Sequence, residues 1–168
     1  MVSLKLAEPD DFDFFFRLKS EPSNIAWSGH DKAPDRENLN RFFLSCIQHQ
    51  AEREARKIYM VLDGDTLVGH LYLIPEPYPE CESNSFGLSP AISEQYWLRG
   101  YAKEAIRLGL EFGKQMGFSE MYTMIREDNQ ASFHAFLACG VQRTEDYHME
   151  YIPSLGKEVK MVVVRKRL

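Results

Sequence analysis

The spacing of apolar side chains changes twice in the first part of the chain. Residues 2–7 alternate between apolar and polar, which is the period of a strand with one buried face. Residues 9–18 begin with a proline and two aspartates and carry apolar side chains at helical spacing, so they predict a helix. Residues 19–34 lack periodicity and contain two prolines and a glycine, so we expect a loop there.

Asp35 is typical of a helix N-cap, and the residues after it predict a second helix. The apolar side of this helix holds Leu39, Phe42, Phe43, Cys46 and Ile47. Residues 57–62 and 67–74 are apolar runs on either side of Asp63-Gly64-Asp65, a composition that favours a tight hairpin. After a proline-rich loop, residues 83–88 predict a further strand.

A long helix is predicted over residues 99–116, where Gly117 ends it. Gly109 and Gly113 lie one turn apart within this helix. Because glycine has no side chain, this pair would let the helix lie close against a sheet.

The C-terminal part returns to short elements. Residues 121–125 predict a strand, residues 129–138 a helix, and residues 143–151 and 158–165 two strands that fold back on each other. The order is therefore β-α-α-β-β-β-α-β-α-β-β. This is a mixed α/β (α+β) arrangement with a largely antiparallel N-terminal half, and we expect residues 1–168 to form a single domain.

Composition and charge narrow the class of protein. The 168 residues are 44% apolar and 12% aromatic, so the chain can bury a core and is not of the disordered class. The formal net charge of −5 argues against nucleic acid as a partner and favours a cationic substrate. Neither a membrane-spanning run nor a signal peptide is recognised, so we expect a cytoplasmic protein that does not bind membranes.

The cysteines and histidines predict no metal centre. Cys46, Cys81 and Cys139 are odd in number and far apart, so neither a disulfide frame nor a zinc site is indicated. The histidines do not have the spacing of zinc ligands. Cys139 has no evident basic partner, and its place beside a helix end suits a small buried residue better than a nucleophile.

Candidate chemistry begins at Arg99-Gly100-Tyr101-Ala102-Lys103, where the long helix starts. The first turn of a helix leaves backbone N–H groups unpaired, and the helix dipole adds partial positive charge there. A glycine in the entering loop lets a phosphate approach this backbone, and an arginine side chain suits phosphate oxygens. The stretch therefore indicates a phosphate site.

A second motif lies about thirty residues further on, where residues 129–141 begin with Asn-Gln-Ala-Ser and end in Cys-Gly-Val. An Arg-Gly loop opening a helix, then a strand, then a short Asn-x-x-Ser helix resembles the GNAT superfamily of N-acetyltransferases. Arg99, Gly100 and Ala102 match the family's pyrophosphate loop, whereas Trp97 and Leu98 depart from the polar and glycine residues usual before it. In its motifs the chain is most similar to the branch that acetylates ribosomal-protein N-termini.

The resemblance implies a GNAT-like acyl-CoA N-acyltransferase fold, with a mixed, mostly antiparallel sheet flanked by helices. Two neighbouring strands of that fold splay apart and hold the acyl-pantetheine of acetyl-CoA between them. The cofactor-binding residues implied here are Phe86, Gly87, Leu88, Arg99, Gly100, Tyr101, Ala102, Lys103, Asn129 and Ser132.

In this family the amine attacks the thioester directly within a ternary complex. One proton leaves the attacking ammonium and another reaches the departing thiolate. The usual proton donor to the thiolate is a tyrosine, and Phe136 stands at that position. We therefore expect Ser132 or a water molecule to provide the hydrogen bond.

Glu82 is the candidate general base implied by the resemblance, since carboxylates on this strand often deprotonate the amine through water. An exposed acid at a strand end is the alternative interpretation. His70, in the middle of a predicted strand, is a second catalytic candidate, with a hydrogen-bonded core histidine as its alternative.

Trp27 and His30 are candidate substrate-binding residues, because in this fold the loop between the first two helices walls the acceptor site. The alternative is a loop anchored by Trp27 in the core. Tyr147, with His148 and Tyr151, is a candidate for the opposite wall or simply a cover for the sheet.

The resemblance thus implies transfer of an acetyl group from acetyl-CoA, without a metal, to a primary amine. The amine belongs to a small molecule, an amino sugar or a peptide N-terminus. The alternative is a catalytically silent acyl-CoA-binding module. A homodimer formed through the C-terminal strands is a further expectation.

Overall fold

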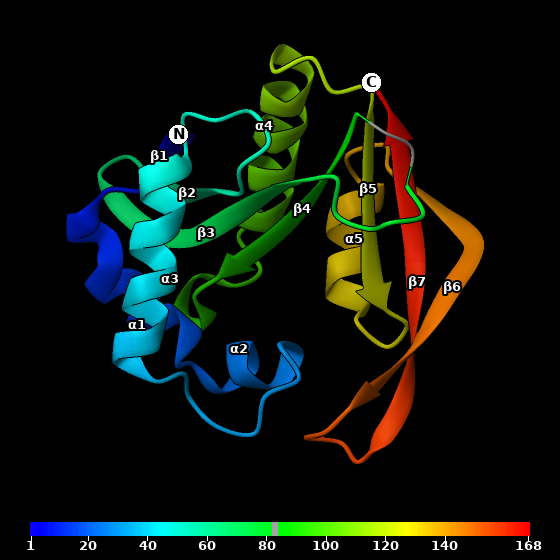
Figure 1. The fold of residues 1–168 in the computed structure, drawn as a ribbon, viewed down its shortest axis with the longest axis horizontal. Helices are drawn as coiled ribbons and strands as arrows, with labels where there is room; N and C mark the ends of the chain where they lie inside the picture. The colour runs from blue at the N-terminus through cyan, green and yellow to red at the C-terminus, as the bar shows by residue number, and fades with distance from the viewer. Residues whose placement is uncertain (82–83) are drawn as a thin grey trace.

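Seven strands form one sheet in the order β1-β2-β3-β4-β5-β7-β6 (Figure 1). The computed structural model describes residues 1–81 and 84–168, so Glu82, the predicted base, lies outside the described residues. The strands are β1 (Val2–Leu6), β2 (Lys57–Asp63), β3 (Thr66–Pro75), β4 (Ser85–Ile92), β5 (Glu120–Arg126), β6 (Gln142–Ile152) and β7 (Lys157–Arg167). The helices are α1 (Phe12–Lys19), α2 (Pro22–Trp27), α3 (Arg36–His49), α4 (Tyr101–Gln115) and α5 (Gln130–Leu137).

The strand pairing confirms the predicted largely antiparallel N-terminal half. β1 to β4 pair in chain order, each antiparallel to the next, and the β2–β3 turn has Gly64 at a positive φ of 58°. β4 and β5 are parallel, and β7 then lies between β5 and β6. Strands from both ends of the chain therefore belong to one sheet.

Helices α1 and α3 cover one face of the sheet. Their aromatic side chains pack on β2 and β3, with Phe15 and Phe43 fully buried and their ring centroids 4.9 Å apart. The side chain of Asp35 accepts a hydrogen bond of 2.9 Å from the Asn38 N–H. The predicted N-cap and the predicted apolar side of α3 are thus both confirmed.

Helices α4 and α5 cover the other face and share a core with β3, β4, β5 and β7. A Cβ on Gly109 would lie 2.7 Å from Cδ2 of Leu71, and one on Gly113 would lie 2.1 Å from Cζ of Phe86. The expected close approach of this helix to the sheet is confirmed.

The structure departs from the prediction most clearly at three places. The loop over residues 19–34 contains α2, because Pro22 at the first helical position starts a short helix that buries none of its side chains and so leaves no apolar period. The long helix begins at Tyr101 and not at residue 99, because Gly100 is left-handed with φ 82°. β4 extends to Ile92 and includes Pro90, which a strand with one open edge tolerates.

Candidate functional site

β4 and β5 separate after a short parallel contact. They pair only at Ser85–Glu120 and Phe86–Met121, and beyond these residues the two strands diverge (Figure 1). They are still close at Gly87, where an added Cβ would lie 3.1 Å from the carbonyl oxygen of Tyr122. The strand separation implied by the family resemblance is present, and Phe86, Gly87 and Leu88 lie where it starts.

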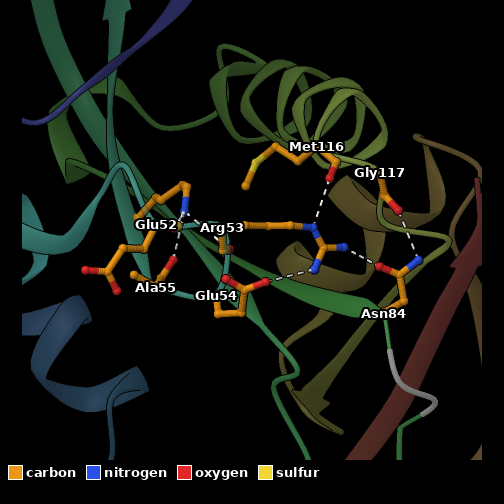
Figure 2. A network of polar contacts seen from close by, with 8 residues as sticks. Glu52, Arg53, Glu54, Ala55, Asn84, Met116 and Gly117 are labelled. Carbon is orange, nitrogen blue, oxygen red and sulfur yellow. Dashed lines mark hydrogen bonds and ion pairs between the residues drawn. The ribbon is translucent and has the colours of Figure 1, made fainter.

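A polar network holds the closed end of this separation (Figure 2). The Arg53 side chain donates a 3.1 Å hydrogen bond to the Met116 carbonyl at the end of α4 and another to the Asn84 side chain at the start of β4. The Asn84 amide donates in turn to the Gly117 carbonyl at 3.0 Å. The Arg53 guanidinium also lies 4.1 Å from the ring centroid of Phe118. These contacts connect the starts of β4 and β5 through the end of α4.

The loop before α4 contains two left-handed residues. Leu98 has φ 61° and a fully exposed side chain, at a position where the family usually has a polar residue or glycine, and Gly100 has φ 82°. The Trp97 indole N–H donates a 2.8 Å hydrogen bond to the Ile92 carbonyl and so attaches the loop to the end of β4. Arg99 is exposed, with its guanidinium carbon 5.7 Å from the ring centroid of Tyr96.

The start of α4 presents backbone donors beside this loop. The first helical hydrogen bond runs from the Glu104 N–H to the Gly100 carbonyl at 3.1 Å, so the N–H groups of residues 101–103 precede the helical ladder. Tyr101 has a structural role, since its hydroxyl donates to Asp63 at 2.7 Å. Lys103 is exposed, and Ala102 is partly buried.

Asn129 and Ser132 lie together at the start of α5. The Asn129 side-chain oxygen accepts a 3.2 Å hydrogen bond from the Ser132 N–H, which makes Asn129 the N-cap of this helix. Ser132 is partly exposed. Phe136, at the position where the family usually has tyrosine, is 2% exposed and belongs to the core under α4 and α5.

His70 is fully buried, and neither ring nitrogen has a hydrogen-bond partner in the described parts of the chain. Burial, with a smaller contribution from the charge of Lys19, holds the pKa of His70 well below its usual range, so the ring is neutral. His70 is therefore a core residue, as its alternative interpretation predicts, but the predicted hydrogen bonds are wrong. A ring without an exposed atom cannot exchange a proton with a substrate in this conformation.

Trp27 is 45% exposed, so its alternative interpretation as a core anchor was wrong. Its ring lies 4.1 Å from the guanidinium carbon of Arg126, the last residue of β5. Gly29 lies against the Ile152 side chain of β6, and His30 is exposed. The segment carrying Trp27 and His30 therefore lies where β4 and β5 are separated, on the side covered by α1 and α3.

Tyr147 is not brought together with Trp27 and His30. It is 53% exposed and pairs with Val162, whose side chain belongs to the core under α4 and α5. Directly paired residues share a face of the sheet, so Tyr147 lies on the α5 side. Side chains alternate between the two faces along a strand. Ile152 is five residues after Tyr147, so it lies on the opposite face, where it contacts Gly29.

Tyr78 was missed as a candidate. It lies in the proline-rich connection between β3 and β4, where the sequence has no period. Its ring centroid is 5.4 Å from that of Tyr122, and the Thr123 side chain and Met124 backbone of β5 act on its hydroxyl to lower the pKa. Burial is the main cause that raises the pKa of Tyr78, so the hydroxyl keeps its proton near neutral pH.

Residues 1–81 and 84–168 contain neither a membrane-spanning helix nor a metal-binding cluster. No helix in these ranges has the length and apolarity needed to cross a membrane. No group of three or more His, Cys, Asp or Glu side chains in them could hold a metal ion.

Comparison with known proteins agrees with this geometry. A family model described as an acetyltransferase (GNAT) domain matches residues 2–142. A spermidine N-acetyltransferase from Vibrio cholerae, solved with CoA and spermine, superposes with a TM-score of 0.82 at 17% identity, covering 99% of this chain and 95% of that one.

Two further solved structures have the same fold. A ribosomal-protein-alanine N-acetyltransferase from Brucella melitensis has a TM-score of 0.79 at 14% identity, with 99% of both chains covered. A phosphinothricin acetyltransferase from Sinorhizobium meliloti, solved with acetyl-CoA, has a TM-score of 0.80 at 14% identity, covering 99% of this chain and 88% of that one. Identities this low show a shared fold and not a shared acceptor, so the ribosomal-protein branch stays a prediction.

Proposed function

The chain belongs to the GNAT family of acetyltransferases, and from that premise we propose that it transfers an acetyl group from acetyl-CoA to a primary amine. The observation that carries the proposal is the separation of β4 from β5 beyond Phe86, beside a left-handed loop that opens α4. In this proposal residues 1–168 act as a single domain.

The first turn of α4 would hold the diphosphate of CoA. The N–H groups of residues 101–103 precede the helical ladder, and the exposed Arg99 and Lys103 add positive charge beside them. Asn129 and Ser132 at the start of α5 would hold the neighbouring part of the cosubstrate. The thioester would then lie against Gly87 and Leu88, where the strands part.

Two proton transfers accompany the attack of the amine on the thioester carbonyl. As the new C–N bond forms and the C–S bond breaks, the amine nitrogen loses a proton and the thiolate accepts one. Phe136 is buried and has no proton to donate. We propose Tyr78 as the proton donor, as an alternative to Ser132, because its ring packs on Tyr122 of β5 and burial raises the pKa of its hydroxyl, which therefore keeps its proton. Glu82 stays a prediction as general base.

Binding of acetyl-CoA tests the first half of this proposal. Acetyl-CoA at about a hundred times its Kd should stabilise the fold by about 2.7 kcal/mol. For a chain of this size the melting temperature should rise by roughly 5–10 °C. An unchanged melting temperature at saturating acetyl-CoA would contradict both acetyl transfer and the silent acyl-CoA-binding alternative.

Thiol release from acetyl-CoA tests the second half. The acceptors are polyamines, aminoglycosides, amino sugars, amino acids and short peptides with different N-termini. Release stimulated by one class would establish the enzyme and its type of acceptor. Binding of acetyl-CoA without release across the panel would instead support the silent module. Sedimentation of the free protein would test the predicted homodimer, in which the edge strand β6 would pair with its copy.

A further inference from the structure

A cluster of cationic side chains lies on the face of the sheet covered by α1 and α3. The Lys19 ammonium, at the end of α1, is 5.0 Å from the ring centroid of Tyr72 and 5.9 Å from that of Phe15. The Arg56 guanidinium carbon, just before β2, lies 5.5 Å from the centroid of the same Tyr72 ring. Two cations thus converge on one ring of β3.

Neither Lys19 nor Arg56 has a counter-ion in the parts of the chain that the structure describes. Among the described residues, no carboxylate forms an ion pair with Lys19 or Arg56, and the charge acting on Lys19 is that of Arg56. The cations of the same surface that border this cluster differ, since Arg36 pairs with Asp13 and Lys5 pairs with Asp11. Bringing two unpaired cations together over a partly apolar surface costs free energy that an anion would offset.

His70 packs against the same Tyr72 ring from within the core. Its ring centroid is 4.4 Å from that of Tyr72, and both ring nitrogens lack partners in the described chain. A neutral imidazole carries one N–H donor, and a buried donor without an acceptor is rare in folded proteins. The two cations and the buried His70 thus place unpaired donors around Tyr72, of which Lys19 and Arg56 are the ones that an anion can contact.

The cluster is one strand away from the β4–β5 separation. Tyr72 pairs directly with Ser89 of β4, and Ser89 is exposed. Directly opposite residues share a face of the sheet, and neighbouring strands lie about 5 Å apart. The Tyr72 ring, which both cations approach, thus lies beside the exposed Ser89 of β4 and on the face opposite α4. This position separates the cluster from the proposed diphosphate site at the α4 loop.

We propose that the acceptor amine carries an acidic group, a carboxylate or a phosphate, which the Lys19–Arg56–Tyr72 cluster binds while the amine faces the β4–β5 separation. This proposal rests on the proposed acetyl transfer and narrows its acceptor. Burial and the neighbouring Arg56 lower the pKa of Lys19 to about 8, so the ammonium is mostly charged at neutral pH and has a proton to share. A polyamine would meet like charge at this cluster.

The test compares acidic and neutral product analogues that differ in one group. N-acetylglycine, N-acetyl-β-alanine, 4-acetamidobutyrate and N-acetyl-O-phosphoethanolamine are titrated by calorimetry, with and without CoA, against the amides of the three carboxylic acids and N-acetylethanolamine. We expect at least one acidic analogue to bind about tenfold or more tightly than its neutral partner. Which acid is preferred distinguishes a carboxylate from a phosphate.

Three variants test whether the Lys19–Arg56–Tyr72 cluster causes the preference for acidic analogues. Lys19→Met should abolish the preference for acid, and Lys19→Arg should keep it. Lys114→Met, which removes an exposed lysine from the far end of α4, should change nothing. Equal binding of acid and neutral analogues, a preference that survives in Lys19→Met, or no binding of any acid at millimolar concentration would each overturn the proposal. Binding of acetyl-CoA is measured on the same proteins, and its absence from the unaltered protein would contradict the proposed acetyl transfer instead.

Discussion

The side chains of Arg53 and Asn84 hydrogen-bond to each other across the closed end of the β4–β5 separation. Arg53 precedes β2 and Asn84 precedes β4, so the contact joins segments that are far apart in the sequence. Arg53 also donates to the Met116 carbonyl at the end of α4. Its side chain therefore connects the end of α4 to the start of β4, where the separation begins (Figure 2).

Arg53→Met should lower the free energy of unfolding by about 2 kcal/mol, since it removes the bonds to Asn84 and Met116 and the contact with the Phe118 ring. Urea unfolding measures this change. Arg41→Met is the matched control, because Arg41 is exposed and its ion pair with Glu37 on α3 should contribute less than about 0.5 kcal/mol. Equal losses of unfolding free energy in both variants would show that Arg53 stabilises the protein no more than an exposed arginine does.

Gly113→Ala should destabilise the protein, although alanine ordinarily stabilises an α-helix interior by about 1 kcal/mol relative to glycine. The new Cβ would lie 2.1 Å from Cζ of the buried Phe86, which is too close for two carbon atoms. We expect a loss of roughly 1–3 kcal/mol in thermal unfolding. Combining Gly113→Ala with Phe86→Leu should recover part of this loss, and no recovery would locate the strain elsewhere.

The contribution of Lys19 to stability should rise with pH above about 8. The folded-state pKa of about 8 lies below the ordinary 10.5, so between these values the unfolded chain binds more protons than the folded one. The folded state therefore gains up to about 3 kcal/mol as pH rises through this window. Lys19→Met should lack the gain, and the difference between the two unfolding curves measures it.

Two other groups near Lys19 oppose this gain, but both proteins carry them, so their effect cancels in the difference between the two curves. Burial raises the pKa of Cys46 and of Tyr72 above their ordinary 9.0 and 10.0, so the folded state keeps these protons longer than the unfolded chain, and it lowers the pKa of His70 well below the window. A difference curve that is flat between pH 8 and 10.5 would contradict the lowered pKa of Lys19. At neutral pH Lys19→Met should be as stable as the unaltered protein or more so, because it removes a buried charge.

Arg99→Glu should weaken acetyl-CoA binding about tenfold or more by placing a negative charge beside the CoA diphosphate. The side chain is exposed, so the melting temperature without ligand should not change. Lys114→Glu reverses a charge near the other end of α4 and serves as the control. If both variants bind acetyl-CoA like the unaltered protein, Arg99 does not belong to the cofactor site.

Tyr78→Phe should lower kcat about tenfold or more while the Kd for acetyl-CoA stays constant, because it removes the proposed proton donor and keeps the ring. Steady-state rates with the acceptor found in the thiol-release panel measure the effect. An unchanged kcat in Tyr78→Phe, with a loss in Ser132→Ala, would assign the donor to Ser132.

Local signals carried much of the fold prediction. The hairpin around Gly64, the cap at Asp35 and the end of α4 at Gly117 each depend on backbone preferences of a few adjacent residues. Gly113 was informative because a helix residue without a side chain lets the sheet approach closely at that point. Where the local signal was weak, as for α2, or was countered by a proline, as for Pro90 in β4, the prediction failed.

Sequence alone determined the element order, the family resemblance and the position of the Arg99–Gly100 loop, because periodicity, capping and motif spacing are properties of neighbouring residues. Tertiary structure decided that His70 is buried without hydrogen bonds, that Tyr78 reaches β5, and that Tyr147 lies on the face opposite Trp27. It also brought Lys19 and Arg56 to the same ring. These relationships depend on which strands pair and in which register, and pairing between distant segments is selected by burial over the whole sheet and not by any local pattern.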